Sequence, residues 1–133
     1  MKGRAFFDNN ILICAAVKND PRSKRSEQLL AVGGVISLQI LNEFVSVARG
    51  KYQMSWQALK IALQWIRFLC PEVVPVKIET HEAAVKIAQR YGYRIYDSLI
   101  IASALGANCQ VLYSEDLQDG QEIDGLTIRN PFV

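Results

Sequence analysis

Acidic residues follow apolar segments at four widely separated places in the chain. Asp8 follows RAFF, Glu43 lies beyond VISL, Asp97 follows YRIY, and Asp116 closes VLYSED. If the fold gathers these carboxylates at one site, they repel one another and stay ionised only when cations compensate. Oxygen ligands without a nearby His or Cys favour Mg²⁺ or Mn²⁺ over Zn²⁺. Such a metal can bind a phosphate oxygen and lower the pKa of a water, so phosphodiester hydrolysis is the predicted chemistry.

Each acid taken alone has an ordinary structural role. An Asp or Glu at a helix start commonly caps the helix or interacts favourably with its dipole. Only convergence of the four side chains on one edge of a sheet would distinguish a metal site from four separate caps. The elements between the acids therefore decide the interpretation.

Short apolar strands alternate with helical segments along the chain. We expect strands over residues 4–7, 35–38, 73–78, 110–113 and 126–129. Helices are expected after residue 8 and over 23–32, 39–48, 56–70, 81–91 and about 96–106. Thr80 is the expected N-cap of the 81–91 helix. Strands joined by helical crossovers form a mainly parallel sheet with helices on both faces, and such sheets bind ligands at their strand ends.

Length and composition indicate one domain with a substantial core. The chain has 133 residues, of which 50% are apolar, so we predict a single domain over 1–133. Its net charge is only +2, so it lacks the overall positive field of many nucleic-acid binders. Three cysteines lack metal-binding spacing and are predicted to be reduced core residues: Cys14, Cys70 and Cys109. No apolar run reaches membrane-spanning length. We expect a cytoplasmic protein without membrane contact.

The helix predicted over residues 56–70 has an unusually wide apolar surface. Its polar positions fall within an arc of about 80°: Gln57, Lys60, Gln64 and Arg67. One interpretation is that another chain covers part of the apolar surface, which predicts a homodimer through some of Trp56, Ile61, Trp65 and Phe68. The other is that the helix is buried between neighbours within the domain.

Two groups of basic residues are candidates for RNA contact. Lys18, Arg22, Lys24 and Arg25 form the densest cluster, which equally fits a solvated helix face. Arg90 and Arg94 bracket YGY close to Asp97, and we favour this pair for phosphate binding. His81, the only histidine, is expected to be a surface or capping residue.

The acids lie in four segments whose order is informative: FFDNNILICA, SLQILNEFVSV, YRIYDSLIIASAL, and VLYSEDLQDG with LTIRNPF. These segments resemble, in turn, the opening strand and turn, the helix with the second acid, the helix with the third acid, and the C-terminal strand pair of PIN-domain ribonucleases. The resemblance covers essentially the whole chain. The group that the chain most resembles is the VapC toxins of bacterial toxin–antitoxin pairs.

The resemblance implies a three-layer α/β/α domain with a mainly parallel, about five-stranded sheet. It also implies a Mg²⁺-dependent (or Mn²⁺-dependent) endoribonuclease toxin that cleaves RNA by water attack and is blocked by a cognate antitoxin. Asp8, Glu43, Asp97 and Asp116 then take the catalytic roles. Asp8 and Asp97 would bind metal directly, and Asp116 would be a ligand or support one. Glu43 would bind metal through water or orient the attacking water.

Other positions refine this site. Asn10 and Ser114 match polar residues that hydrogen-bond the acids in the family. Asn9 stands where the family usually has Thr or Ser, so an amide replaces a hydroxyl and the positioning of the acids is affected. Glu115 is a less favoured alternative to Asp116, because adjacent residues of an extended segment point to opposite sides.

Two other functions compete with a ribonuclease. A phosphotransfer receiver domain also places acids at strand ends, but it needs a lysine near the late strands, and the last lysine here is Lys86. A catalytically silent PIN-like module that binds RNA or a protein partner would have no physical reason to keep four acids together. The ribonuclease is therefore the leading hypothesis.

Overall fold

A six-stranded sheet forms the centre of the protein. The structure, a computed structural model, describes residues 4–17 and 19–133, and Lys18 lies outside these ranges. Within them the strand order is β3-β2-β1-β4-β6-β5. The strands are β1 Ala5–Phe7, β2 Val35–Ser37, β3 Glu72–Val74, β4 Val111–Tyr113, β5 Glu122–Ile123 and β6 Leu126–Arg129. All pairs are parallel except β5 with β6.

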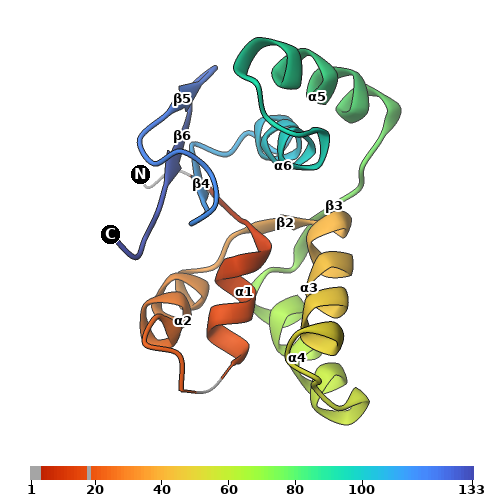
Figure 1. The fold of residues 1–133 in the computed structure, drawn as a ribbon, viewed down its shortest axis with the longest axis vertical. Helices are drawn as coiled ribbons and strands as arrows, with labels where there is room; N and C mark the ends of the chain where they lie inside the picture. The colour runs from red at the N-terminus through yellow and green to blue at the C-terminus, as the bar shows by residue number, and fades with distance from the viewer. Residues whose placement is uncertain (1–3, 18) are drawn as a thin grey trace.

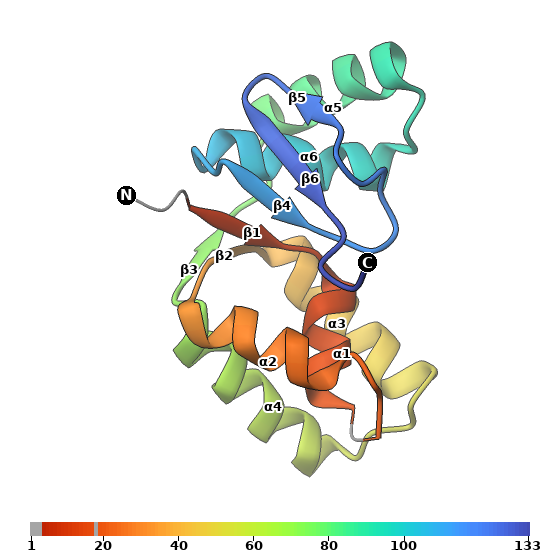
Figure 2. The same ribbon diagram turned by 90° about the vertical axis from the view of Figure 1, so that its left-hand side faces the viewer.

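Helices cover both faces of this sheet, as Figures 1 and 2 show. One layer holds α1 Asn9–Ala16, α2 Ser23–Val32, α3 Leu38–Gly50 and α4 Trp56–Leu69; the other holds α5 Ile78–Tyr91 and α6 Ile95–Gly106. The predicted three-layer, mainly parallel fold is confirmed. The sheet has six strands and not about five, because the two-residue β5 pairs with β6 through a tight turn. That turn places Asp124 and Gly125 at positive φ, 49° and 90°.

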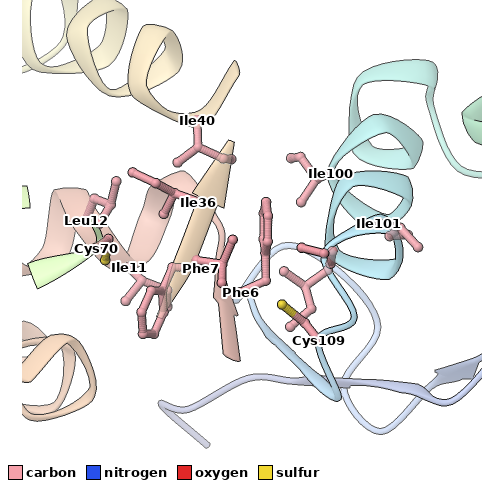
Figure 3. Packing of buried hydrophobic residues seen from close by; sticks show 14 of the residues in the cluster. Phe6, Phe7, Ile11, Leu12, Ile36, Ile40, Cys70, Ile100, Ile101 and Cys109 are labelled. Carbon is pink, nitrogen blue, oxygen red and sulfur yellow. The ribbon is translucent and has the colours of Figure 1, made fainter. Parts of the chain in front are cut away.

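The core lies on both sides of β1, the strand between β2 and β4. Figure 3 shows Phe6 and Phe7 of β1 between Ile11 of α1 and Ile100 of α6. Because side chains alternate across a strand, two adjacent phenylalanines supply apolar contacts to both helical layers. All three cysteines are buried and unpaired, as predicted. This packing fixes the edge at which β1 ends and α1 begins.

A close backbone approach fixes the start of β2 against β1. A Cβ atom at Gly34 would overlap the edge of the Phe7 ring and lie 2.8 Å from the Ala5 carbonyl oxygen. A phenylalanine ring can shift slightly, but the carbonyl belongs to the sheet backbone and cannot. Glycine at this position therefore allows β1 and β2 to pair beneath a fully packed ring.

The structure corrects the sequence interpretation of residues 73–80. β3 ends at Val74 and α5 begins at Ile78, so the predicted strand is too long and the predicted helix too short. Pro75 has no N–H to donate to a sheet, which explains why the strand stops there. Thr80 is not the N-cap. It lies within the first turn of α5, where its Oγ1 accepts a hydrogen bond from the Lys77 N–H at 3.1 Å.

Helix α4 presents large apolar side chains to solvent. Only Leu59 and Ile66 of this helix are fully buried. Trp56, Ile61, Trp65 and Phe68 are 57%, 57%, 59% and 83% exposed. The interpretation that neighbours within the domain bury this face is wrong for these four residues. We call Ile61, Trp65 and Phe68 the α4 face.

Among the described residues, the helices are too short or too polar to cross a membrane.

Candidate active site

The four acids line one cavity of about 350 Å³ at the carboxyl edge of the sheet. Asp8 follows β1, Glu43 lies in α3, Asp97 lies in the first turn of α6, and Asp116 follows β4. Since β1 pairs in parallel with both β2 and β4, the segments that leave these strands emerge at the same edge. We call this space the acid cavity. A larger cavity, of about 610 Å³, adjoins α5 and α6 but none of the four acids lines it.

Asp8 is the most enclosed of the four acids, with 5% of its surface exposed. It is the N-cap of α1, and its Oδ1 accepts a hydrogen bond from the Asn9 N–H at 2.6 Å. Its Oδ2 accepts one from the Ser114 hydroxyl at 2.7 Å. Burial raises its pKa to about 6 against the opposing effect of these bonds, and the charges of Glu43 and Asp116 raise it further. The Asp8 carboxylate can therefore cap α1 and also be a metal ligand.

Asp116 is held by the two supporting residues that the sequence indicated. The Asn10 side-chain amide donates to Asp116 Oδ2 at 3.1 Å, and the Asp116 N–H donates to Ser114 Oγ at 3.1 Å. Ser114 is fully buried and thus links Asp116 to Asp8. This network fixes the relative positions of two acids from different strands.

Asp97 and Glu43 face the same cavity from α6 and α3. Partial burial raises the pKa of Asp97, with a further contribution from the Asp116 charge, whereas Arg94 lowers it. Glu43 Oε2 accepts a hydrogen bond from the Gln39 side-chain amide at 3.0 Å, one helical turn away. The negative charge of Asp116 repels those of Asp8 and Asp97, and a bound cation would relieve this repulsion.

Glu115 also lines the cavity, contrary to the expectation that it would point away from Asp116. The chain bends after β4 and is no longer extended at these residues. Arg22 forms an ion pair with Glu115 and a second with Asp20, the latter at 2.8 Å. Hydrogen bonding to Arg22 lowers the pKa of Asp20 to about 2. Because Glu115 already has a cation partner, Asp116 is the better candidate ligand.

Two cationic side chains line the acid cavity, and one of them, Arg22, belongs to the basic cluster that the sequence indicated. Arg22 precedes α2 and Lys51 follows α3, and both line the cavity. Arg90 and Arg94, which we favoured from the sequence, do not line it. The Arg90 guanidinium lies 5.2 Å from the centroid of the neighbouring Tyr91 ring, and Arg94 is the N-cap of α6.

The remaining basic candidates lie elsewhere. Lys24 and Arg25 are exposed outside the cavity, and Lys18 is outside the described residues. His81 is exposed on α5, as expected. Tyr52 also lines the acid cavity, and no sequence signal indicated it, because only the turn after α3 brings it there.

The ligand chemistry of the acid cavity fits Mg²⁺ or Mn²⁺. Its donors are carboxylates together with the Asn9 amide, whose buried Oδ1 has no hydrogen-bond partner among the described residues. Burial raises the pKa of the Cys14 thiol in the cavity wall to about 11, so it stays protonated. Within the described ranges, no three Asp, Glu, His or Cys side chains are grouped closely enough to hold an ion as they stand. The side chains would have to close around a cation.

Solved structures share this fold at low sequence identity. A toxin–antitoxin complex from Klebsiella pneumoniae matches with a TM-score of 0.73 and 23% identity over 96% of this chain and 97% of that one. Mycobacterium tuberculosis VapC20, described as a toxin that cleaves the sarcin–ricin loop, matches with a TM-score of 0.67 and 19% identity over 81% and 86%. VapBC2 from Rickettsia felis, bound to a promoter DNA fragment, gives 0.66 and 18% over 95% and 97%. No curated protein sequence matches significantly.

The sequence also matches a known protein family. The PIN domain model matches residues 5–121, which include all four acids and most of the chain. The solved structures add that this fold is the one found in VapC toxins. The chain therefore belongs to the PIN domain family.

Proposed function

We propose that this protein is a Mg²⁺- or Mn²⁺-dependent endoribonuclease toxin that hydrolyses RNA phosphodiester bonds. The observation that carries the proposal is that Asp8, Glu43, Asp97 and Asp116, from four separate elements, line one cavity. Membership of the PIN domain family and the RNA-cleaving activity named for VapC20 support it. Nothing in packing or helix capping requires all four acids at one edge.

We assign each acid a role from the residues around it. Asp8 and Asp97 would bind the cation directly, because burial raises the pKa of both and so favours a compensating charge. Asp116, fixed by Asn10 and Ser114, would complete or support the ligand set. When bound, the cation would polarise the phosphate and lower the pKa of the attacking water. Glu43, oriented by Gln39, would accept a proton from that water.

Cations around the acid cavity would hold the RNA backbone. Arg22 and Lys51 line the cavity and are the nearest candidates for the phosphate that is cleaved. Arg22 must share its guanidinium with Asp20 and Glu115, so its geometry is constrained before RNA arrives. Arg90 and Arg94 remain candidates for a phosphate further along the strand, since Arg94 is close enough to lower the pKa of Asp97.

Two kinds of protein partner are proposed, at two different surfaces. We propose a cognate antitoxin that blocks the acid cavity, supported by the toxin–antitoxin complexes among the structural neighbours. We also propose a homodimer, for which the exposed α4 face is the candidate contact. A cytoplasmic location would fit an RNA substrate and three reduced cysteines.

Cleavage of total RNA tests the proposal. We expect native protein with Mn²⁺ to cleave, and EDTA or Asp97→Asn to abolish cleavage. Glu82→Gln, which neutralises an exposed acid on α5, is the matched control and should cleave normally. Equal cleavage by native protein and Asp97→Asn would refute the assigned site. RNA binding without cleavage, unaffected by loss of the acids, would favour the silent binding module.

A further inference from the structure

A second cavity adjoins the acid cavity. It has a volume of about 520 Å³ and lies between the start of α3, the segment after β3 and the start of α6. Its walls include Leu38, Gln39, Asn42, Val76, Tyr96 and Leu99. Glu43 lines both cavities, so they lie next to each other at one catalytic candidate. We call this second space the Tyr96 groove.

The groove exposes flat and aliphatic surface. Tyr96 is 66% exposed, Leu38 is 50% exposed and Val76 is 41% exposed. Tyr96 immediately precedes Asp97 in the first turn of α6, so it is the sequence neighbour of a residue that lines the acid cavity. Exposed apolar side chains from three elements meet here beside polar catalytic candidates. An exposed apolar patch beside polar residues is typical of a binding site.

The polar side chains that line the groove are two amides, Gln39 and Asn42, with the Ser46 hydroxyl and the Glu43 carboxylate. Gln39 Nε2 donates to Glu43 Oε2 at 3.0 Å and to the Tyr96 carbonyl at 3.2 Å, which fixes the side chain. Gln39 Oε1 is buried and has no hydrogen-bond donor among the described residues, so this amide shapes the groove and does not face it. Asn42 lies one turn of α3 beyond Leu38 and offers a second amide. Apart from Glu43, the side chains that line the groove carry no charge.

These features suit an uncharged, planar ligand. A phosphate would need cations, and in this part of the molecule Arg22 and Lys51 lie in the acid cavity and not in the groove. A nucleobase instead offers a π face for an aromatic ring and an edge that an exposed amide such as Asn42 can read. We propose that the Tyr96 groove binds an unpaired nucleobase next to the cleaved phosphate, with Tyr96 stacking on the base. The inference rests on the proposed ribonuclease function and names single-stranded or looped RNA as its substrate class.

A second protein chain is the competing occupant, and the groove suits it less well. The α4 face offers three large exposed apolar side chains, and the cavity that Ile61 and Trp65 line is apolar apart from Glu27 and contains no amide side chain. The lining of the Tyr96 groove includes two amides, a hydroxyl and an acid, which a protein partner would have to match. Its position next to the acid cavity, with Glu43 in the lining of both, is also what a strand passing from base to phosphate requires.

The test uses an RNA oligonucleotide that carries a mapped cleavage site, with 2-aminopurine placed in turn at each position around it. Binding is measured in the cleavage-deficient Asp97→Asn protein, and kcat and KM are measured in the otherwise native protein. Tyr96→Ala should weaken binding about five- to hundredfold, the range expected for loss of one base–aromatic stack. Tyr96→Phe keeps the ring and should bind within about twofold of the parent. Val85→Ala, an exposed apolar side chain of α5 outside both cavities, is the control.

Fluorescence separates stacking from a general loss of structure. At one position next to the cleaved phosphate, 2-aminopurine should be quenched by the parent and Tyr96→Phe proteins but not by Tyr96→Ala. Asn42→Ala should change the preference among the four bases at that same position. Unchanged affinity and quenching in Tyr96→Ala would overturn the inference while leaving cleavage by native protein intact. A change of oligomeric state in Tyr96→Ala by light scattering would assign the groove to a second copy and also overturn it. Absence of RNA binding and cleavage by folded native protein would refute the proposed function itself.

Discussion

Replacing Asp8 with Asn should make the metal-free protein more stable near neutral pH. Asp8 is buried, and its pKa rises from 3.8 to about 6 mainly because burial disfavours the charged form. The folded protein therefore holds this proton over a pH range in which the unfolded chain has released it. Stability from this group is present below about pH 4 and is lost as pH rises to about 6.

The magnitude follows from the size of the shift. About two pK units correspond to roughly 3 kcal/mol at pH 7. The amide introduced by Asp8→Asn would keep an oxygen for the Asn9 N–H, but the hydrogen bond from Ser114 would have to be rearranged, which costs about 1 kcal/mol. The net expectation for Asp8→Asn in EDTA at pH 7 is a gain of about 1–3 kcal/mol in the free energy of unfolding.

Urea unfolding between pH 4 and pH 7, followed by circular dichroism, measures this effect. The difference between Asp8→Asn and native protein should be small near pH 4 and grow towards pH 7. Adding Mn²⁺ at about one hundred times its Kd should stabilise the native protein by about 3 kcal/mol and leave the variant almost unchanged. A variant that is less stable than native at pH 7 in EDTA, or a difference that does not vary with pH, would refute the reasoning.

Three further predictions use other positions. Asn9→Thr introduces a hydroxyl, as the resemblance to PIN-domain ribonucleases leads us to expect here, and calorimetry should show at least a severalfold change in Mn²⁺ affinity. An identical affinity would mean that the Asn9 oxygen, which has no hydrogen-bond partner among the described residues, does not contribute. Gly34→Ala should lower the unfolding free energy by about 1–3 kcal/mol because a methyl group meets the Ala5 carbonyl, and an unchanged urea midpoint would contradict this packing. Light scattering should find a homodimer that Trp65→Ser combined with Phe68→Ser converts to monomer. A native monomer at high micromolar concentration would rule out that dimer.

The fold was largely predictable because its signals are local and strong. The helix over 23–32 and the strand over 126–129 match α2 and β6 residue for residue, since turn residues and apolar runs mark their ends. The error at 73–80 arose where apolar residues continue past Pro75 without forming a strand. β5 was missed because two residues carry no periodicity.

The acid cavity was predictable in its acids and in the supporting Asn10 and Ser114, but not in the cations that line it. Asp8 and Asp116 follow strands, so the rule for strand ends in parallel sheets brings them to one edge. Arg22 and Lys51 reach the cavity only through the loops before α2 and after α3. Loop geometry is not encoded in a local sequence pattern. Arg90 and Arg94 were favoured because they are close to Asp97 in the sequence, but they do not line the cavity. Tertiary contacts decide which cations face the acids.

Cleavage of an RNA with one sulfur substitution tests the central claim most directly. A non-bridging oxygen of the mapped cleavage site is replaced by sulfur, and cleavage is compared in Mg²⁺, Mn²⁺ and EDTA. If a cation held by the acid cavity contacts that phosphate, cleavage should fall in Mg²⁺, which prefers oxygen, recover in the more sulfur-tolerant Mn²⁺, and vanish in EDTA. Cleavage that is the same in both metals and persists in EDTA would contradict a metal-dependent ribonuclease site at Asp8, Glu43, Asp97 and Asp116.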